Sequence, residues 1–69
     1  MQPPLFPLIT LKTFEGNTLY LRVPMIEGFC YNEKEKTTYV WTIGGADNTY
    51  KFPGDHTDEI IAAVYGWEV

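Results

Sequence analysis

Two side chains in this sequence could act together as a nucleophile and its base, Cys30 and His56. A thiolate next to an imidazole can carry out covalent catalysis when a third group orients the imidazole. The sequence shows no residue for that third position, and it shows no backbone donors for an oxyanion. We therefore expect Cys30 to behave as a small apolar strand residue and His56 to lie at the exposed start of a helix.

Three other patterns could hold a ligand or a proton. Asp55, His56 and Asp58 have donor atoms that bind divalent metals, but acidic residues at a helix start also stabilise the helix dipole, and we expect that role. Gly44-Gly45 leads into a strand and not into the helix that a phosphate-binding loop requires, so it predicts a hairpin turn. Acid–base catalysis needs a buried acid, and the acidic residues all lie in predicted turns, strand edges or helix ends. We expect no catalytic residue, metal or cofactor.

The composition favours binding over catalysis. The chain of 69 residues contains two Trp, five Tyr and four Phe, which are residue types that dominate cores and interfaces. Its formal net charge of −4 opposes the phosphate neutralisation on which binding of double-stranded nucleic acid depends. A domain this small has a marginal core, and a single cysteine and a single histidine allow neither an internal disulfide nor a four-ligand zinc site. Oligomerisation is the remaining common source of stability, so we expect a homo-oligomer.

The sequence also predicts a location in the cell. No apolar run approaches the length of about 20 residues that a membrane-spanning helix needs. Residues 1–4, Met-Gln-Pro-Pro, lack the basic start of a secretory signal peptide, and no apolar run of signal length follows them. We expect a cytoplasmic protein without membrane contact, in which one reduced cysteine is ordinary.

The order of apolar patterns predicts a single domain, residues 1–69, of class α+β. Residues 1–7 contain three prolines and predict an extended arm, in which Leu5 and Phe6 can pack on another surface. Residues 55–66 have helical spacing, with a cap at Asp55 or Thr57 and a stop at Gly66, before a tail at 67–69. Residues 8–53 predict a β-meander, with a solvated charged turn at 32–36 and strands at 8–14, 18–23, 25–31, 37–43 and 49–52.

We expect one antiparallel sheet of about five strands, with the C-terminal helix packed on one sheet face. Consecutive strands joined by short turns pair antiparallel, and a single amphipathic helix must bury its apolar stripe on a sheet. Gly28 is a candidate bulge in the third strand. The residues predicted to be buried are Leu19, Leu21 and Val23 in the second strand, and Ile60, Ile61, Val64 and Tyr65 in the helix.

Several short stretches between residues 9 and 64 also match a known family. They are Ile9-Thr10-Leu11-Lys12, Gly16-Asn17, Leu19-Tyr20-Leu21, Met25-Ile26-Glu27, Thr37-Thr38-Tyr39-Val40, Tyr50-Lys51-Phe52 and Asp58-Glu59-Ile60-Ile61. In these stretches the chain resembles the small flagellar FlbD family, short cytoplasmic proteins with a meander of strands and a terminal helix that starts at an acidic pair. The resemblance implies the same α+β fold and no catalytic residues. The proline-rich arm, the many aromatic residues and the tail containing Trp67 depart from the family pattern.

A helix of about ten residues cannot cover both faces of a five-stranded sheet. Strand alternation places Tyr39, Trp41 and Ile43 on one face of the fourth strand. We expect the aromatic residues outside the helix-covered core to form an exposed face, unless a strongly twisted sheet or the proline-rich arm covers them. Large exposed apolar patches mark interaction sites. The residues expected on this aromatic face are Tyr20, Phe29, Tyr31 and either Tyr39 or Trp41.

Two functional hypotheses follow. In the first, a small non-enzymatic protein self-associates and binds a partner protein through the aromatic face, as a regulator or a phage-type inhibitor would. In the second, an oligomer binds or sequesters a small molecule or nucleotide in pockets between subunits. There Trp41 or Tyr39 would stack on a ring, and Arg22 or Lys51 would meet an anion. The candidate binding residues are therefore Tyr20, Arg22, Phe29, Tyr31, Tyr39, Trp41 and Lys51.

Overall fold

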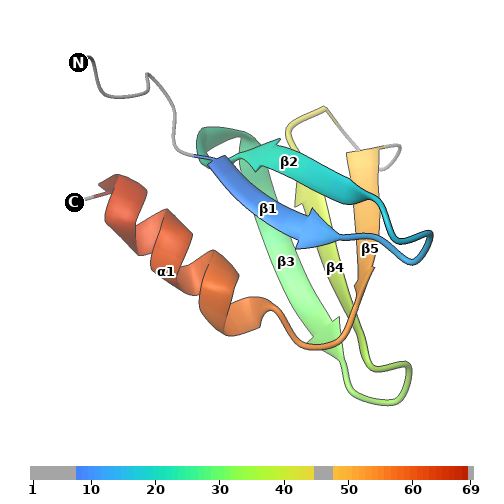
Figure 1. Ribbon diagram of the computed structural model, residues 1–69. Coiled ribbons are helices and arrows are strands. Elements are labelled where there is room, and N and C mark those ends of the chain that lie inside the picture. Colours follow the sequence, from blue (N-terminus) through green and yellow to red (C-terminus); the bar gives the residue numbers. More distant parts are fainter. Residues whose placement is uncertain (1–7, 45–47, 69) are drawn as a thin grey trace.

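The computed structural model describes residues 8–44 and 48–68. The predicted arm at residues 1–7 and the second glycine of the Gly44-Gly45 turn lie outside the described residues. Five strands and one C-terminal α-helix confirm the α+β class, and the predicted strand boundaries lie within two residues of the observed ones. The elements are β1 (Leu8–Lys12), β2 (Thr18–Arg22), the 3-10 helix η1 (Val23–Met25), β3 (Ile26–Asn32), β4 (Thr37–Thr42), β5 (Thr49–Pro53) and α1 (Thr57–Glu68) (Figure 1).

The strands form two antiparallel sheets and not the single sheet that the sequence predicts. β1 and β2 pair as a hairpin, and β3, β4 and β5 form a three-stranded sheet with β4 in the centre. The second and third strands were expected to be neighbours, but η1 separates them, with Pro24 in its first turn. Because proline fixes its own backbone angle and has no N–H for a ladder, the chain leaves the first sheet there and starts a second.

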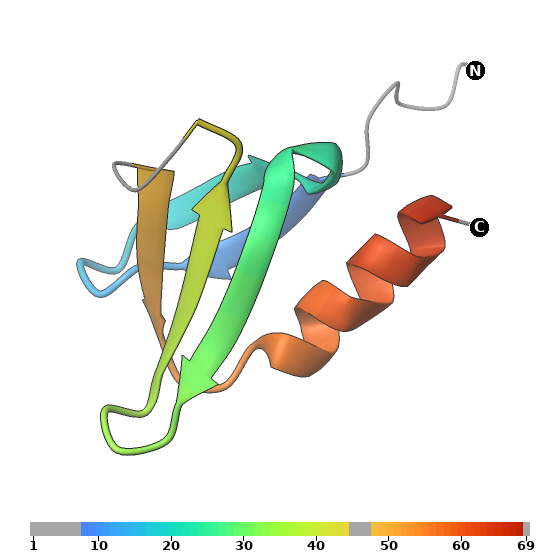
Figure 2. The ribbon, with the colours of Figure 1, turned by 180° about the vertical axis from the view of Figure 1, so that it is seen from behind.

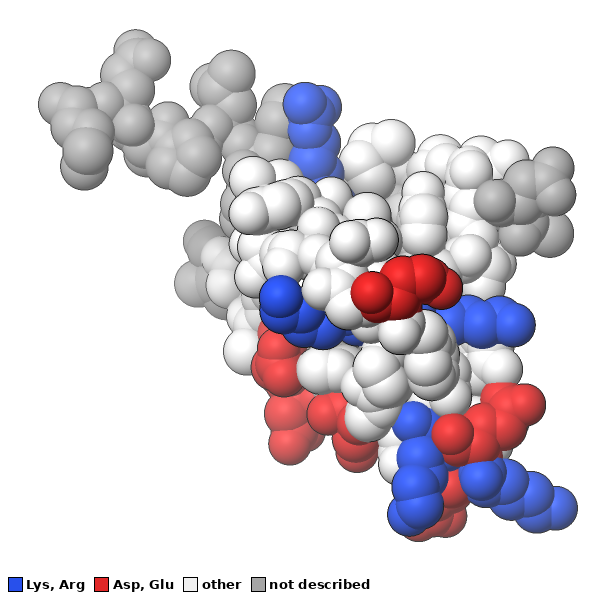
Figure 3. Space-filling view, turned by 45° about the vertical axis from the view of Figure 1, so that its right-hand side comes forward, with Lys and Arg blue, Asp and Glu red and all other residues white. Residues whose placement is uncertain are grey.

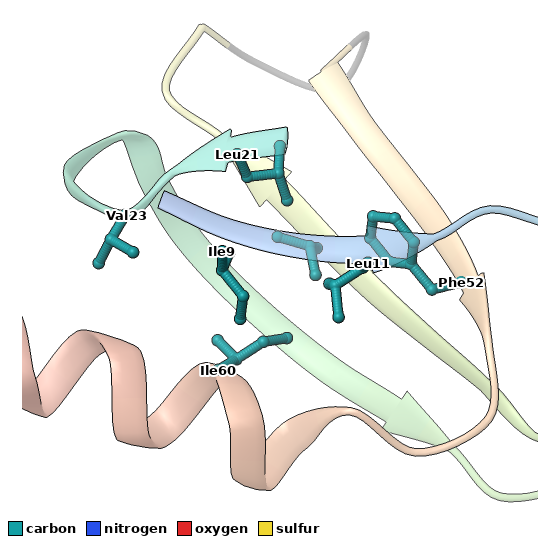
Figure 4. Packing of buried hydrophobic residues seen from close by; sticks show 7 residues of the cluster. Ile9, Leu11, Leu21, Val23, Phe52 and Ile60 are labelled. Carbon is teal, nitrogen blue, oxygen red and sulfur yellow. The ribbon is translucent and has the colours of Figure 1, made fainter. Parts of the chain in front are cut away.

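The core lies between the two sheets. Figure 1 shows the hairpin in front of the three-stranded sheet, and α1 lies along their open side, where it packs against η1, β1 and β3. Leu21 and Val23 are buried and Leu19 packs against them, as predicted. Figure 4 shows the buried side chains gathered between the sheets and the helix. They are Ile9, Leu11, Leu21, Val23, Val40, Phe52 and Ile60.

Local sequence explains where α1 begins. The Asp55 carboxylate accepts hydrogen bonds from the backbone N–H (3.0 Å) and the hydroxyl (2.6 Å) of Thr57, the first residue of the helix. These hydrogen bonds hold the pKa of the Asp55 carboxyl below its usual range. Asp58 and Glu59 follow in the first turn, where negative charge complements the helix dipole. At the other end the prediction is wrong, because α1 continues through Gly66 to Glu68.

The buried stripe of α1 is narrower than predicted. Ile60 is fully buried, and Ala63 and Val64 pack against the core, at the i+3 and i+4 positions that share its side of the helix. Ile61 and Tyr65 are 39% and 64% exposed, so their assignment to the stripe is wrong. The reason is the position of α1, which closes one side of the two sheets and does not lie across a broad sheet face.

Thr38 connects the central strand to the start of the helix. Its side chain is fully buried. Its hydroxyl donates to the carbonyl of Gly54 (2.6 Å) and accepts from the backbone N–H of His56 (3.0 Å). The buried hydroxyl therefore has both a donor and an acceptor partner, and both belong to the connection between β5 and α1.

Replacing Ile60 by Ala should lower the free energy of unfolding by about 2–5 kcal/mol, because the change leaves a cavity in the core. Ile61→Ala removes the same atoms from a side chain that is 39% exposed, whereas Ile60 is fully buried, so it should cost less. Urea unfolding followed by circular dichroism gives both values. Equal losses in the two variants would contradict the observed packing of α1.

Replacing Thr38 by Val keeps the side-chain shape but leaves the carbonyl of Gly54 and the backbone N–H of His56 without their side-chain partner. We expect a loss of about 1–3 kcal/mol in the free energy of unfolding. Thr42→Val is the matched control, since Thr42 lies on the same face of β4 and its hydroxyl makes a long hydrogen bond, 3.4 Å from the carbonyl of Asn48. If both variants unfolded at the same urea concentration, the link through Thr38 would not stabilise the fold.

Candidate functional site

Three of the predicted binding residues lie together on the outer face of the three-stranded sheet. Tyr39 and Trp41 point outward from β4, since Val40 between them is fully buried and points to the core. Lys51 is the register partner of Tyr39 on β5, and it therefore lies on the same outer face. Both aromatic residues that were alternatives in the sequence analysis thus occupy this surface.

Phe29 and Tyr31 lie on the opposite face of the same sheet. They pair with Val40 and Thr38, which are fully buried and face the core. Phe29 itself packs against the core. A shift in the register between Ile26 and Gly28 marks the bulge that the sequence suggested. The expectation that Phe29 and Tyr31 belong to an aromatic face outside the core is therefore wrong, because their cross-strand partners point inward.

Tyr20 and Arg22 lie on a third surface, the outer face of the hairpin. Leu21 between them points into the core, and Tyr20 is 66% exposed. The two sheets pack through their inner faces, so their outer faces lie on different sides of the molecule. Figure 1 shows the hairpin in front, and Figure 2, from behind, shows the three-stranded sheet in front. Tyr20 and Arg22 therefore cannot join Tyr39 and Trp41 in one contact surface.

Trp41 lies directly over Gly28 of the neighbouring strand. The two residues are register partners in β4 and β3. A Cβ atom added at Gly28 would lie 2.7 Å from Trp41 Nε1, and closer still to the adjacent ring carbons. Only glycine leaves room for the indole at this position, so the ring covers backbone where other strands carry a side chain.

Tyr39 is held from two sides. Its hydroxyl donates a short hydrogen bond to Glu35 Oε1 in the turn between β3 and β4. Lys51 Nζ lies 5.8 Å from the centre of the phenol ring, within the range of a cation–π contact. The hydrogen bond to the Glu35 carboxylate is the main reason that the pKa of Tyr39 lies above its usual value. Sequence reasoning treated Glu35 as part of a solvated charged turn and missed this contact.

We refer to the surface formed by Gly28, Cys30, Tyr39, Trp41, Thr49 and Lys51 as the β4 face. Figure 2 shows this side of the three-stranded sheet with no helix or strand in front of it. The alternating charges of residues 33–36 gather at one end of the molecule (Figure 3), next to the Tyr39 end of β4. The β4 face therefore has aromatic residues in its centre and charged residues at one end.

The residues considered for catalysis are not brought together. Cys30 is exposed on the β4 face, where it pairs with Tyr39. The His56 ring lies edge-on to Phe52, a core residue, with 6.5 Å between ring centres. Its Nε2 donates to the carbonyl of Pro53 (2.8 Å), and its Nδ1 lies 3.0 Å from Glu59 Oε1. His56 thus has a structural role in the link to α1, on the other side of the sheet from Cys30.

The part of the chain that the structure describes shows no metal site, no ligand pocket and no membrane-spanning helix. Among residues 8–44 and 48–68, no group of three or more His, Cys, Asp or Glu side chains could hold a metal ion, and no pocket is found. Asp55, one of the residues considered as a metal ligand, is engaged by Thr57. Within the same residues, no helix is long and apolar enough to cross a membrane.

Comparison with known proteins identifies no relative of this chain. No family model, no curated protein and no solved structure matches the chain. The resemblance to the FlbD family therefore stays a prediction.

The contact between Glu35 and Tyr39 predicts a pH-dependent change. The pKa of Tyr39 in the folded protein is raised above 10.0, so the folded state retains the phenol proton more strongly than the unfolded state. Its contribution to stability is complete below pH 10 and is lost as the pH rises through the folded-state value. In an absorbance titration of the tyrosines, Glu35→Gln should lower the pKa of Tyr39, because it removes the carboxylate that accepts the hydrogen bond from the phenol and repels the phenolate. Tyr39→Phe identifies the signal. A titration curve that Glu35→Gln leaves unchanged would show that the contact is absent in solution.

Proposed function

We propose that this chain is a small non-enzymatic interaction protein of the cytoplasm, which self-associates and binds a partner protein through the β4 face. The observation that supports the proposal is the pair Tyr39 and Trp41 on the outer side of the central strand, with no element of the described chain across them (Figure 2). Aromatic residues of this kind are enriched where protein interfaces gain most of their binding energy.

The aromatic side chains of the β4 face are already positioned for binding. Trp41 rests on Gly28, and Tyr39 is held between Glu35 and Lys51. Ordering a mobile side chain on association has an entropic cost, so aromatic groups that are held in place before binding retain more of their contact energy. A face with fixed rings can therefore bind through a small area.

The shape and charge of the β4 face favour a protein over the other classes of ligand. Small-molecule sites are concave, whereas no pocket is found in the described part of the chain. Lys51 is the one basic residue among those that define the face, which is a poor basis for binding nucleic acid. An apolar centre with charged groups at the edge is typical of a protein interface. A regulator or phage-type inhibitor that occupies a partner's surface fits this description.

The alternative, an oligomer that sequesters a ring-containing anion, would have to form its pocket between subunits. Trp41 and Lys51 share a face and could contribute to such a pocket, but Arg22 lies on the other outer face. Purified protein that carried an absorbing small molecule in stoichiometric amount would favour this alternative over a protein partner.

Trp41→Ala should abolish capture of the partner while the fold is retained. The tagged protein, added to an extract of the organism that encodes it, should recover a specific protein by mass spectrometry, and Trp41→Ala should lose that protein. Tyr20→Ala is the control, because it removes an exposed aromatic side chain from the other outer face and should retain the partner. Thermal melts of both variants verify folding. If folded Trp41→Ala recovered the partner at the wild-type level, the β4 face would not be the binding surface.

A further inference from the structure

Three exposed apolar side chains lie at one end of the molecule. Leu8, Met25 and Ile43 are 57%, 44% and 53% exposed. Leu8 is the first residue of β1, Met25 is the last residue of η1, and Ile43 directly follows β4. Figures 1 and 2 show the start of β1, η1 and the end of β4 together in the upper part of the view. Single exposed apolar residues are ordinary, whereas a group of them at one place marks a contact surface.

These side chains form a path that ends at the β4 face. Leu8 is the register partner of Arg22, the residue directly before η1. At the other end of η1, the carbonyl of Met25 accepts a hydrogen bond from the backbone N–H of Ile43 (2.9 Å). Trp41 lies two residues before Ile43, on the same side by strand alternation. We name Leu8, Met25, Ile43 and Trp41 the apolar track.

The proline-rich arm begins where the apolar track begins. Residues 1–7 read Met-Gln-Pro-Pro-Leu-Phe-Pro and join the chain at Leu8. An extended segment of this length spans up to about 23 Å. The path from Leu8 to Trp41 is roughly 20 Å long, because it consists of one strand pair, the short η1, one hydrogen-bonded pair and two strand residues. The arm is therefore long enough to follow the whole track.

The order of residues in the arm matches the order of residues along the track. Leu5 and Phe6 lie three and two residues before Leu8, so in an extended arm they reach the middle of the track, where Met25 and Ile43 are exposed. The two prolines before Leu5 then reach Trp41. Extended proline-rich segments bind to surfaces with aromatic side chains, and their restricted backbone lowers the entropic cost of binding.

Charge does not oppose this contact. Residues 1–7 contain no charged side chain, and neither do the four residues of the track. The charged residues nearest to the track in the sequence are Arg22 and Glu27. Because the side chains of the arm are neutral, neither of these two residues repels them.

We propose that residues 1–7 bind along the apolar track of their own chain and cover Trp41, so that the arm competes with the partner protein for the β4 face. The inference rests on the proposed function, because it assigns a regulation to the same site. The connection at Leu8 favours the arm of the same chain over that of a second copy. A short tether gives an effective concentration in the millimolar range, far above that of a second copy in solution.

Contacts between the arm and the track can be measured by NMR on the full chain. Nuclear Overhauser effects should connect the ring protons of Phe6 with the methyl groups of Met25 and Ile43. Their absence would overturn the inference, and so would effects from Phe6 to Ile61 or Tyr65, which place the arm on α1. In a mixture of labelled and unlabelled protein, effects between two chains would assign the arm to a second copy and would also overturn it.

Fluorescence reports on the cover of Trp41. In a Trp67→Phe background, Trp41 is the single tryptophan of the chain. Replacing Leu5 and Phe6 by Ser should shift its emission to longer wavelength and increase its quenching by acrylamide. The matched control is Phe14→Ser, which removes a 56% exposed aromatic side chain from the turn at the other end of β1. Unchanged quenching in the arm variant, or an equal change in the control, would contradict the contact. Circular dichroism verifies folding of both variants.

A synthetic peptide of residues 1–7 tests whether the track is a site that the arm occupies. Added to the arm variant, the peptide should reverse the shift in Trp41 emission. It should bind the chain with an intact arm about tenfold more weakly, if the arm covers the track in about 90% of the molecules. Equal affinity for the two proteins would overturn the inference.

Partner capture separates this inference from the proposed function. The arm variant should recover more of the protein whose capture depends on Trp41. If Trp41→Ala lost that protein but the arm variant recovered no more than the wild type, the competition would be overturned and the proposed function would stand. If Trp41→Ala recovered it at the wild-type level while the NMR contacts were present, the proposed function would fail and the arm contact would stand.

Discussion

The placement of α1 depends on one buried hydroxyl. Thr38 lies in the central strand, and its side chain bonds both Gly54 and His56 in the segment that leads from β5 to the helix. A hydroxyl removed from water must find partners inside the protein, and here each partner is a backbone group of that segment. The helix therefore starts at a fixed position against the sheet. Ile60 then enters the core one turn later, opposite the hairpin (Figure 4).

The position of α1 determines which surfaces stay open. Because the helix closes one side of the two sheets, it covers neither outer face. The hairpin covers the inner face of the three-stranded sheet, and no helix or strand among residues 8–44 and 48–68 lies over the outer face with Tyr39 and Trp41 (Figure 2). The same geometry buries only one side of the helix and leaves Ile61 and Tyr65 outside. Two apolar surfaces thus result from a single packing arrangement.

The sequence predicts the α+β class, five strands, one C-terminal helix and the inward side of β2, because these depend on local periodicity and turn residues. It does not predict that Pro24 and η1 divide the strands into two sheets, and so it places Tyr20 on the same surface as Trp41. Phe29 and Tyr31 were assigned to the wrong side because the inward side of β3 is set by pairing with Val40 and Thr38. The contacts of Trp41 with Gly28 and of Tyr39 with Glu35 depend on register, which residues within one strand do not determine.

Because Trp41 packs over Gly28, the residue type allowed at each of these two positions depends on the other, although they are distant in the chain. Any larger residue at position 28 displaces the indole, and a smaller residue at position 41 exposes the backbone of β3 to water. A substitution at position 28 alone therefore crowds the surface, and a substitution at position 41 alone exposes backbone. We expect the two positions to change together during evolution. A related protein with a larger residue at position 28 should have a smaller residue than tryptophan at position 41. The summed side-chain volume of the two positions would then stay about the same.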